Sequence, residues 1–361
     1  MATLARVYDG GLMTQNSAHA SARRGAFTVP GVLIGHRSLG DTGVTACVSE
    51  DPAGLCAAVD VRGGGPGTRE TDLLEPHNTV ERVHAIMLTG GSAFGLAAAD
   101  GAMAQLESRG IGFPVFGEGV PGPRVPIVPA AVIFDLAVGD AAHRPGPADG
   151  AAAVSAAFGQ PAGVDSGNVG AGCGATAGVL RGGFGTASVS LAGPGSGYRV
   201  AAAVVANPHG SVVDPGTGRL YGDCRLPPVD TARLGALSQP TPQLNTTIGL
   251  IATDCPFAPA QLKRLAMAGH DGLARAVRPA HSPLDGDTFF AVSTAAPMAA
   301  PMAVSTSGGE EGVDTLSAAC EAAAEAVQGA IVDAIVTATT NFGVTAWADL
   351  AGVAPLGHDA H

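Results

Sequence analysis

Short apolar runs separated by turns rich in glycine follow one another along the chain from Val29 onward. Apolar runs of about four to eight residues, bounded by turn residues, are typical of β-strands. On this basis strands are predicted at 43–48, 57–61, 85–89, 185–191, 198–206, 248–253 and 287–294. The runs at 185–191 and 198–206 are joined by a loop of Gly, Pro and Ser, so we expect them to pair as a β-hairpin.

Three other segments, at 93–108, 259–277 and 313–337, carry apolar residues at the three- and four-residue spacing of an amphipathic helix. Ser92 is the expected N-cap of the first of them. Mixed strands and helices, with no linker long enough to separate domains, favour one α+β layered sandwich. We therefore expect a single catalytic domain at 26–361, preceded by a loose leader at 1–25.

Composition and charge narrow the classes of protein to which this chain can belong. Of the 361 residues, 46% are hydrophobic and only 14% are charged, which suits a large core, and the net charge of -12 argues against a nucleic-acid partner. No apolar stretch reaches the roughly 20 residues of a membrane span, and residues 1–25 do not resemble a secretory signal. Six scattered cysteines fit a cytoplasmic protein with reduced thiols. The ten histidines lack metal-ligand spacing, so we expect neither metal nor cofactor.

Asn245-Thr246-Thr247 opens the apolar run at 248–253, after a polar, proline-containing loop. A hydroxyl residue at the start of a strand, behind such a loop, is where a self-cleaving hydrolase keeps its nucleophile. If the bond after Asn245 breaks, the α-amine of Thr246 becomes a general base for its own hydroxyl. With a pKa of about 7.7–8.0, much of that amine is unprotonated near neutrality. The alternatives are an ordinary strand threonine, a glycosylation sequon and a turn asparagine.

Other polar residues could assist such a nucleophile. Asp285 and Asp287 are one residue apart just before a predicted strand, and could orient a hydroxyl, hold an ammonium group or bind a cation. The side-chain amide of Asn207 could polarise a carbonyl group. Each also fits an ordinary turn. The Gly90-Gly91-Ser92 turn could cradle a phosphate, but without the lysine of a P-loop, close packing of strand on helix explains it better.

Four motifs, taken together, resemble the P1 (DmpA-like) aminopeptidase family. This is the group of the D-aminopeptidase/esterase, the β-peptidyl aminopeptidases and the nylon-oligomer endo-hydrolase. The motifs lie at 61–74, 88–96, 125–129 and 245–248, and the resemblance runs from about 29 to 337. It implies an αββα sandwich, of the type shared with ornithine acetyltransferases. It also implies a precursor that cuts itself into an α chain, 1–245, and a β chain, 246–361.

By this resemblance Thr246 is the nucleophile, Asp285 and Asp287 orient it, and Asn207 belongs to the oxyanion site. The Asp-Gly-Asp triplet is more similar to the nylon-oligomer branch than to the aminopeptidase branch, which tends to have Ser-Gly-Glu. A tyrosine found near the substrate in some relatives corresponds to Phe94.

A family lysine has no clear counterpart in this chain, because Val179 or Arg181 occupies the candidate positions. Arg181 would keep the positive charge at a substrate-binding position but cannot deprotonate.

The implied activity is hydrolysis of small peptides or amide oligomers through an acyl-enzyme, by a homotetramer of αβ units. An N-acyltransferase of the ornithine acetyltransferase type is the nearest alternative, since an acyl-enzyme can pass its acyl group to water or to an amine. A non-enzymatic small-molecule binding protein is the third candidate function.

Overall fold

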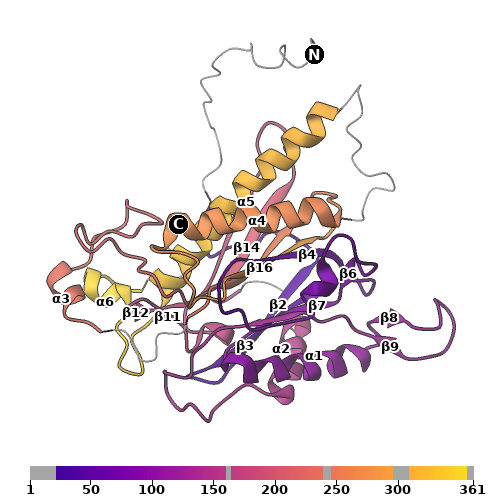
Figure 1. Ribbon diagram of the computed structural model, residues 1–361, viewed down its shortest axis with the longest axis horizontal. Helices are drawn as coiled ribbons and strands as arrows, with labels where there is room; N and C mark the ends of the chain where they lie inside the picture. The colour runs from indigo at the N-terminus through magenta and orange to yellow at the C-terminus, as the bar shows by residue number, and fades with distance from the viewer. Residues whose placement is uncertain (1–21, 160–163, 239–244, 296–308, 356–361) are drawn as a thin grey trace.

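Four layers of secondary structure make up the fold. The computed structural model describes residues 22–159, 164–238, 245–295 and 309–355. Two β-sheets face each other, and a pair of helices covers the outer face of each (Figure 1). This is the αββα arrangement of an α+β sandwich, so the predicted fold class is confirmed.

The larger sheet has seven strands in the order β1-β13-β14-β15-β16-β4-β6. β15 and β16 run parallel to each other, and the other neighbours are antiparallel. Its strands are β1 (Arg23–Arg24), β4 (Leu55–Val61), β6 (Arg82–Val83), β13 (Gly183–Ser190), β14 (Arg199–Ala206), β15 (Ile248–Thr253) and β16 (Thr288–Ser293).

The smaller sheet has five strands in the order β2-β3-β7-β10-β5, with only β7 and β10 parallel. Its strands are β2 (Val32–Ser38), β3 (Gly43–Ser49), β5 (Thr68–Arg69), β7 (Ala85–Thr89) and β10 (Ala130–Val132). Two further pairs of short strands are β8 (Phe113–Pro114) with β9 (Arg124–Val125), and β11 (Thr176–Ala177) with β12 (Leu180–Arg181).

The helices segregate by sheet. α4 (Pro259–Ala276) and α5 (Gly309–Thr337) cover the larger sheet, and α1 (Ala98–Glu107) and α2 (Pro147–Gly159) cover the smaller one (Figure 1). The remaining short helices are η1 (Asp72–Leu74), η2 (Ser92–Ala97), η3 (Gly170–Gly172), α3 (Thr231–Gly235) and α6 (Trp347–Ala351). None of the helices in the described ranges is long and apolar enough to cross a membrane.

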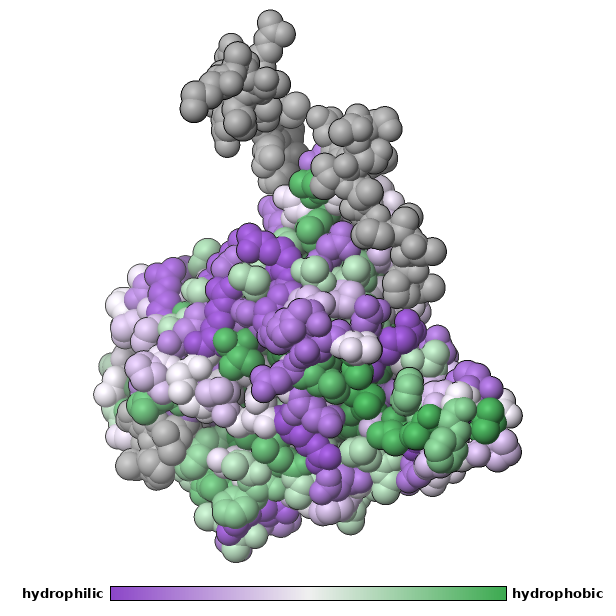
Figure 2. Space-filling view, turned by 45° about the vertical axis from the view of Figure 1, so that its right-hand side comes forward, coloured by the Kyte–Doolittle hydropathy of each residue, from purple (hydrophilic) through white to green (hydrophobic). Residues whose placement is uncertain are grey.

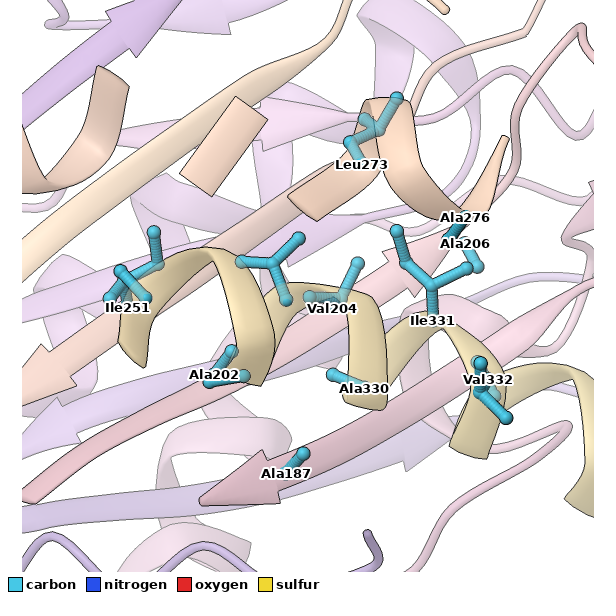
Figure 3. Close-up of a cluster of buried hydrophobic side chains, with 14 of the residues drawn as sticks. Ala187, Ala202, Val204, Ala206, Ile251, Leu273, Ala276, Ala330, Ile331 and Val332 are labelled. Atoms are coloured by element: carbon cyan, nitrogen blue, oxygen red, sulfur yellow. The ribbon is translucent and has the colours of Figure 1, made fainter. Parts of the chain in front are cut away.

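Each pair of adjacent layers encloses an apolar core. Along β14, even-numbered residues belong to the core under α4 and α5, and odd-numbered residues belong to the core between the sheets. Ala202 and Val204 lie beside Ala330 and Ile331 of α5 (Figure 3). Small residues are required here, because a Cβ on Gly185 of β13 would lie 2.2 Å from the Ala330 carbonyl oxygen. A chain with 4% aromatic residues therefore fills its core by bringing backbones close together.

All seven predicted strands and the three predicted long helices are present, with boundaries shifted by a few residues. The start of the first helix was predicted wrongly. Gly91, with φ of +80°, is the N-cap, and Ser92 begins the 3-10 helix η2 without capping it. Of the expected leader, residues 1–21 lie outside the described ranges. Arg23 and Arg24 already belong to the fold, paired with the edge of β13.

Candidate active site

Sheet topology gathers the predicted site residues at one end of the larger sheet. β14 ends where its antiparallel neighbour β15 and the parallel strand β16 begin. Asn207 directly follows β14, Thr246 lies just before β15, and Asp287 directly precedes β16. Residues that are 39, 41 and 80 positions apart in sequence thus meet because three neighbouring strands share an end.

Thr246 is buried, with 5% of its surface exposed, and both its N–H and its hydroxyl have hydrogen-bond partners. Its backbone N–H donates to the Asn207 carbonyl oxygen at 2.8 Å. Its hydroxyl donates to the carbonyl oxygen of Asn245 at 2.5 Å and accepts a bond from the Gly286 N–H at 3.1 Å. The hydroxyl oxygen therefore lies against the very peptide group whose cleavage the sequence predicts.

The two acidic residues hold the backbone around Thr246. Asp287 accepts the Thr247 N–H at 2.8 Å through Oδ1. Asp285 accepts the His209 N–H through Oδ1 and the Ser282 N–H through Oδ2, both at 3.0 Å. Since both carboxylates are buried and bonded to backbone donors, they fix the loop whose central Gly286 N–H is aimed at the Thr246 hydroxyl.

The glycine-rich loop at 62–67 lies directly on this acidic loop. The N–H groups of Arg62 and Gly65 donate to the carbonyl oxygens of Asp287 and Asp285, at 2.9 and 2.7 Å. A Cβ on Gly63 would lie 2.3 Å from the Asp285 carbonyl oxygen, so only glycine allows this approach. The sequence marked this segment as a loop and part of a family motif. Its contact with the acidic pair emerges only from the structure.

Asn207 is fully buried and its amide is held in one orientation. Its Oδ1 accepts the Thr176 N–H at 2.8 Å, and its Nδ2 donates to the Phe134 carbonyl oxygen at 3.2 Å. The hydroxyl of Thr176 in turn accepts a bond from the Asn245 side chain at 3.4 Å. One amide hydrogen of Asn207 is thus engaged, and the amide has a second one to offer an oxyanion. Sequence reasoning missed Thr176 and Phe134, although Thr176 lies in the glycine-dense stretch it noted.

Phe94 and Arg181, the predicted substrate-binding residues, have very different surroundings. Phe94 is 58% exposed on η2, and the Arg144 guanidinium stacks on its ring at 3.9 Å. Arg181 is completely buried on β12, where its Nη2 donates to the Cys173 carbonyl oxygen. Burial lowers the pKa of Arg181 to about 10. Val179, the other candidate for the lysine position, packs against the core under α4 and α5.

A further buried acid, Asp135, explains the Gly90-Gly91 turn. Its Oδ1 accepts the Gly91 N–H at 2.7 Å. Its Oδ2 occupies the space beside Gly90 and Gly174, where a Cβ would lie 2.1 and 2.7 Å away, respectively. Burial raises the pKa of Asp135 to about 6. Gly90 therefore makes room for a carboxyl group of the protein itself.

Comparison with known proteins identifies the family of this chain. The sequence profile of peptidase family S58 matches residues 27–347. An uncharacterized aminopeptidase of Mycobacterium leprae is 49% identical over 291 residues, covering 74% of this chain and 78% of the relative. The 6-aminohexanoate-oligomer endohydrolase of Kocuria sp. is 33% identical over 285 residues, covering 74% of each chain.

Solved structures show the same fold. A β-aminopeptidase of Burkholderia sp. superposes with a TM-score of 0.67 at 28% identity, over 92% of this chain and 90% of the other. The L-aminopeptidase D-Ala-esterase/amidase of Ochrobactrum anthropi, described as a variant of the Ntn hydrolase fold, superposes with a TM-score of 0.66 at 24% identity, over 92% and 90% of the two chains. Fold and relatives define a hydrolase of C–N bonds. The chain belongs to peptidase family S58, which confirms the family resemblance.

The contact between Gly286 and Thr246 leads to a prediction about self-cleavage. In Gly286→Ala the new Cβ would lie 2.8 Å from both the Thr246 hydroxyl oxygen and the Gly65 carbonyl oxygen. Because the hydroxyl must shift, we expect cleavage after Asn245 to slow by about 100-fold, measured by intact mass against time. Gly65→Ala is the matched control, since the nearest atoms among the described residues would lie 3.8 and 3.9 Å from its Cβ. Equal rates for the two variants would contradict the proposed geometry.

The raised pKa of Asp135 predicts a pH-dependent stability. Between about pH 4 and pH 6 the folded protein keeps a proton that the unfolded chain releases, so the free energy of unfolding decreases as pH rises. A shift of about two pH units corresponds to about 3 kcal/mol. In Asp135→Asn this component disappears, so the stability advantage of the variant should grow by about that amount from pH 4 to pH 7.5.

Urea unfolding would measure this difference, with Thr246→Ala present in both proteins so that each remains one chain. The exposed Asp314→Asn is the control and should show no such change. A pH-independent difference between Asp135→Asn and its parent would refute the assignment.

Proposed function

We propose that the chain is a precursor that cleaves its own Asn245–Thr246 peptide bond, producing chains 1–245 and 246–361. The observation that carries this proposal is the 2.5 Å contact between the Thr246 hydroxyl and the Asn245 carbonyl oxygen. In the first step Oγ1 attacks the Asn245 carbonyl carbon. As the C–N bond breaks, the hydroxyl proton passes to the departing Thr246 nitrogen, which becomes an amine. Water then hydrolyses the resulting ester.

Several fixed contacts favour this attack over hydrolysis of an ordinary peptide bond. The Thr246 N–H, the Thr247 N–H and the Thr246 hydroxyl are each held by a buried partner. Holding two reacting groups in place contributes effective molarities of up to about 10⁵–10⁸ M. The second amide hydrogen of Asn207 would stabilise the oxyanion, and losing one such donor typically costs about 10²–10³ in kcat.

The mature enzyme repeats this chemistry on a substrate. The freed α-amine of Thr246 takes the proton from its own hydroxyl, which attacks the substrate amide and forms an acyl-enzyme. The amine half of the substrate leaves with that proton, and water releases the acyl group. The Asn207 carbonyl oxygen, which accepts the Thr246 N–H before cleavage, would hold the amine afterwards. Asp285 and Asp287 act as positioning residues in both rounds.

Small peptides or amide oligomers are the proposed substrates. Relatives named as aminopeptidases are 49% identical to this chain, and one named as a 6-aminohexanoate-oligomer endohydrolase is 33% identical. Both chemistries present a linear amide to the nucleophile. A panel of aminoacyl p-nitroanilides, with L-, D- and β-amino acids, and of 6-aminohexanoate oligomers would identify the preferred class.

We further propose a cytoplasmic homotetramer of αβ units. The six cysteines are free thiols, which suits a reducing compartment. The hairpin at 113–125, here called the arm, extends from the body of the molecule and presents a hydrophobic surface (Figures 1 and 2). Its exposed apolar side chains are Phe113, Val115, Phe116, Val120 and Val125. Apolar surface gathered on a projecting hairpin is typical of a subunit contact.

Replacing the nucleophile tests the proposed activity. Thr246→Ala should leave a single uncut band of about 35 kDa without amidase activity, whereas Thr246→Ser keeps a hydroxyl and should still cleave. Intact-mass spectra and N-terminal sequencing would follow both. Full cleavage of Thr246→Ala, or an active wild type lacking a chain that begins Thr-Thr-Ile-Gly, would rule out this mechanism.

The arm leads to a prediction about assembly. Phe116→Asp puts a charge on the proposed contact, so we expect the particle mass from light scattering to fall below that of the wild type. Phe342→Asp, at an exposed position outside the arm, should leave the mass unchanged. A monomeric wild type, or an unaltered Phe116→Asp oligomer, would argue against the arm as an interface.

A further inference from the structure

His281 makes two contacts with one oxygen of Asp287. Its backbone N–H donates to Oδ2 at 3.2 Å, and its ring Nδ1 lies 2.8 Å from the same atom. In making these contacts His281 adopts a φ of +55°, a left-handed backbone conformation that residues other than glycine rarely take. Such strain persists only where surrounding structure enforces it, and it gathers at functional sites.

The other oxygen of Asp287 holds the backbone next to the nucleophile. Oδ1 accepts the N–H of Thr247, the residue that follows Thr246. One buried carboxylate therefore links His281 to the backbone of the reacting segment. The Gly286 N–H, which donates to the Thr246 hydroxyl, belongs to the residue next to Asp287 in the same loop.

The His281 ring is itself held in place. It meets the His270 ring edge to face at a centroid distance of 4.9 Å, and His270 packs the same way, also at 4.9 Å, on Phe289 of β16. His270 Nε2 lies 3.2 Å from the Asp60 carbonyl oxygen on β4. Two strands of the larger sheet thus support the orientation of the His281 ring.

We propose that His281 is a positioning residue for this hydrolase. Its side chain selects the Asp287 rotamer in which Oδ1 receives the Thr247 N–H, and so keeps the Gly286 N–H on the Thr246 hydroxyl. Within the described ranges His281 makes no hydrogen bond to Asn245 or Thr246, so its effect passes through Asp287. This inference rests on the proposed self-cleavage and deepens it.

The proposal predicts a loss of rate without a loss of fold. When the ring is removed, Asp287 keeps two backbone donors, from Thr247 and His281, so the buried carboxylate remains satisfied. What is lost is the restraint on its rotation. A displacement of about 1 Å at a reacting group can cost about 100-fold in rate.

Two substitutions that tolerate positive φ separate the ring contact from backbone strain. His281→Asn places an amide donor near the position of Nδ1, whereas His281→Gly relieves the strain and offers no side-chain donor. We expect self-cleavage of His281→Asn to remain within about threefold of wild type. His281→Gly should be slower by about 10- to 100-fold, and its mature form should show a reduced kcat at unchanged KM.

The measurements are intact mass against time for the precursor, and steady-state kinetics on an amide that the wild type cleaves. If His281→Gly cleaves itself and turns over as fast as wild type, the proposal is overturned. Should His281→Gly fail to fold, His281→Asp replaces it. Asp has the size of Asn but presents an acceptor to Asp287, so rates equal to those of His281→Asn would overturn the proposal. A wild type that never cleaves overturns the proposed function as well.

Discussion

Close approach of three backbone segments at one end of the larger sheet is the constraint on which the site depends. Thr246, the acidic loop at 285–287 and the glycine-rich loop at 62–67 meet at distances that leave no room for a Cβ at Gly63 or Gly286. At such distances backbone N–H groups can act as fixed donors to a hydroxyl oxygen and to carbonyl groups. Donors fixed in advance need no reorganisation during the reaction, which is why they are effective in catalysis.

The rest of the fold serves to hold this end of the sheet still. β14, β15 and β16 are covered on one face by α4 and α5 and on the other by the smaller sheet, so their side chains are buried on both faces. Burying one Val or Leu contributes about 1.5–3 kcal/mol, and these strands carry many such residues. The buried polar groups at the strand ends, including Asp285, Asp287 and Asn207, are affordable because each is hydrogen bonded.

Much of the fold could be predicted from the pattern of hydrophobic and polar residues within short stretches of the sequence. The strand at 85–89 and the amphipathic helix at 259–277 could be predicted because neighbouring residues alone show their hydrophobic pattern. In the structure their boundaries differ from the predicted ones by a residue or two at most. Ser92 was misassigned because a distant residue, Asp135, ties down the Gly91 N–H, and the chain enters a 3-10 turn. Thr176 and Phe134 escaped notice for the same reason, because their partner Asn207 is far away in sequence. His281 escaped notice because it lies in a loop whose residues show no recognisable pattern.

The sequence by itself determined the strands, the long helices, the family and the candidate nucleophile, because these depend on residue types and on spacing within short windows. Only the tertiary structure decided which atoms face the Thr246 hydroxyl. It buried Arg181 on the Cys173 carbonyl oxygen, left Phe94 on the surface and linked the glycine-rich loop to the acidic pair. Those outcomes depend on strand order and on distances of a few tenths of an ångström, which no local pattern encodes.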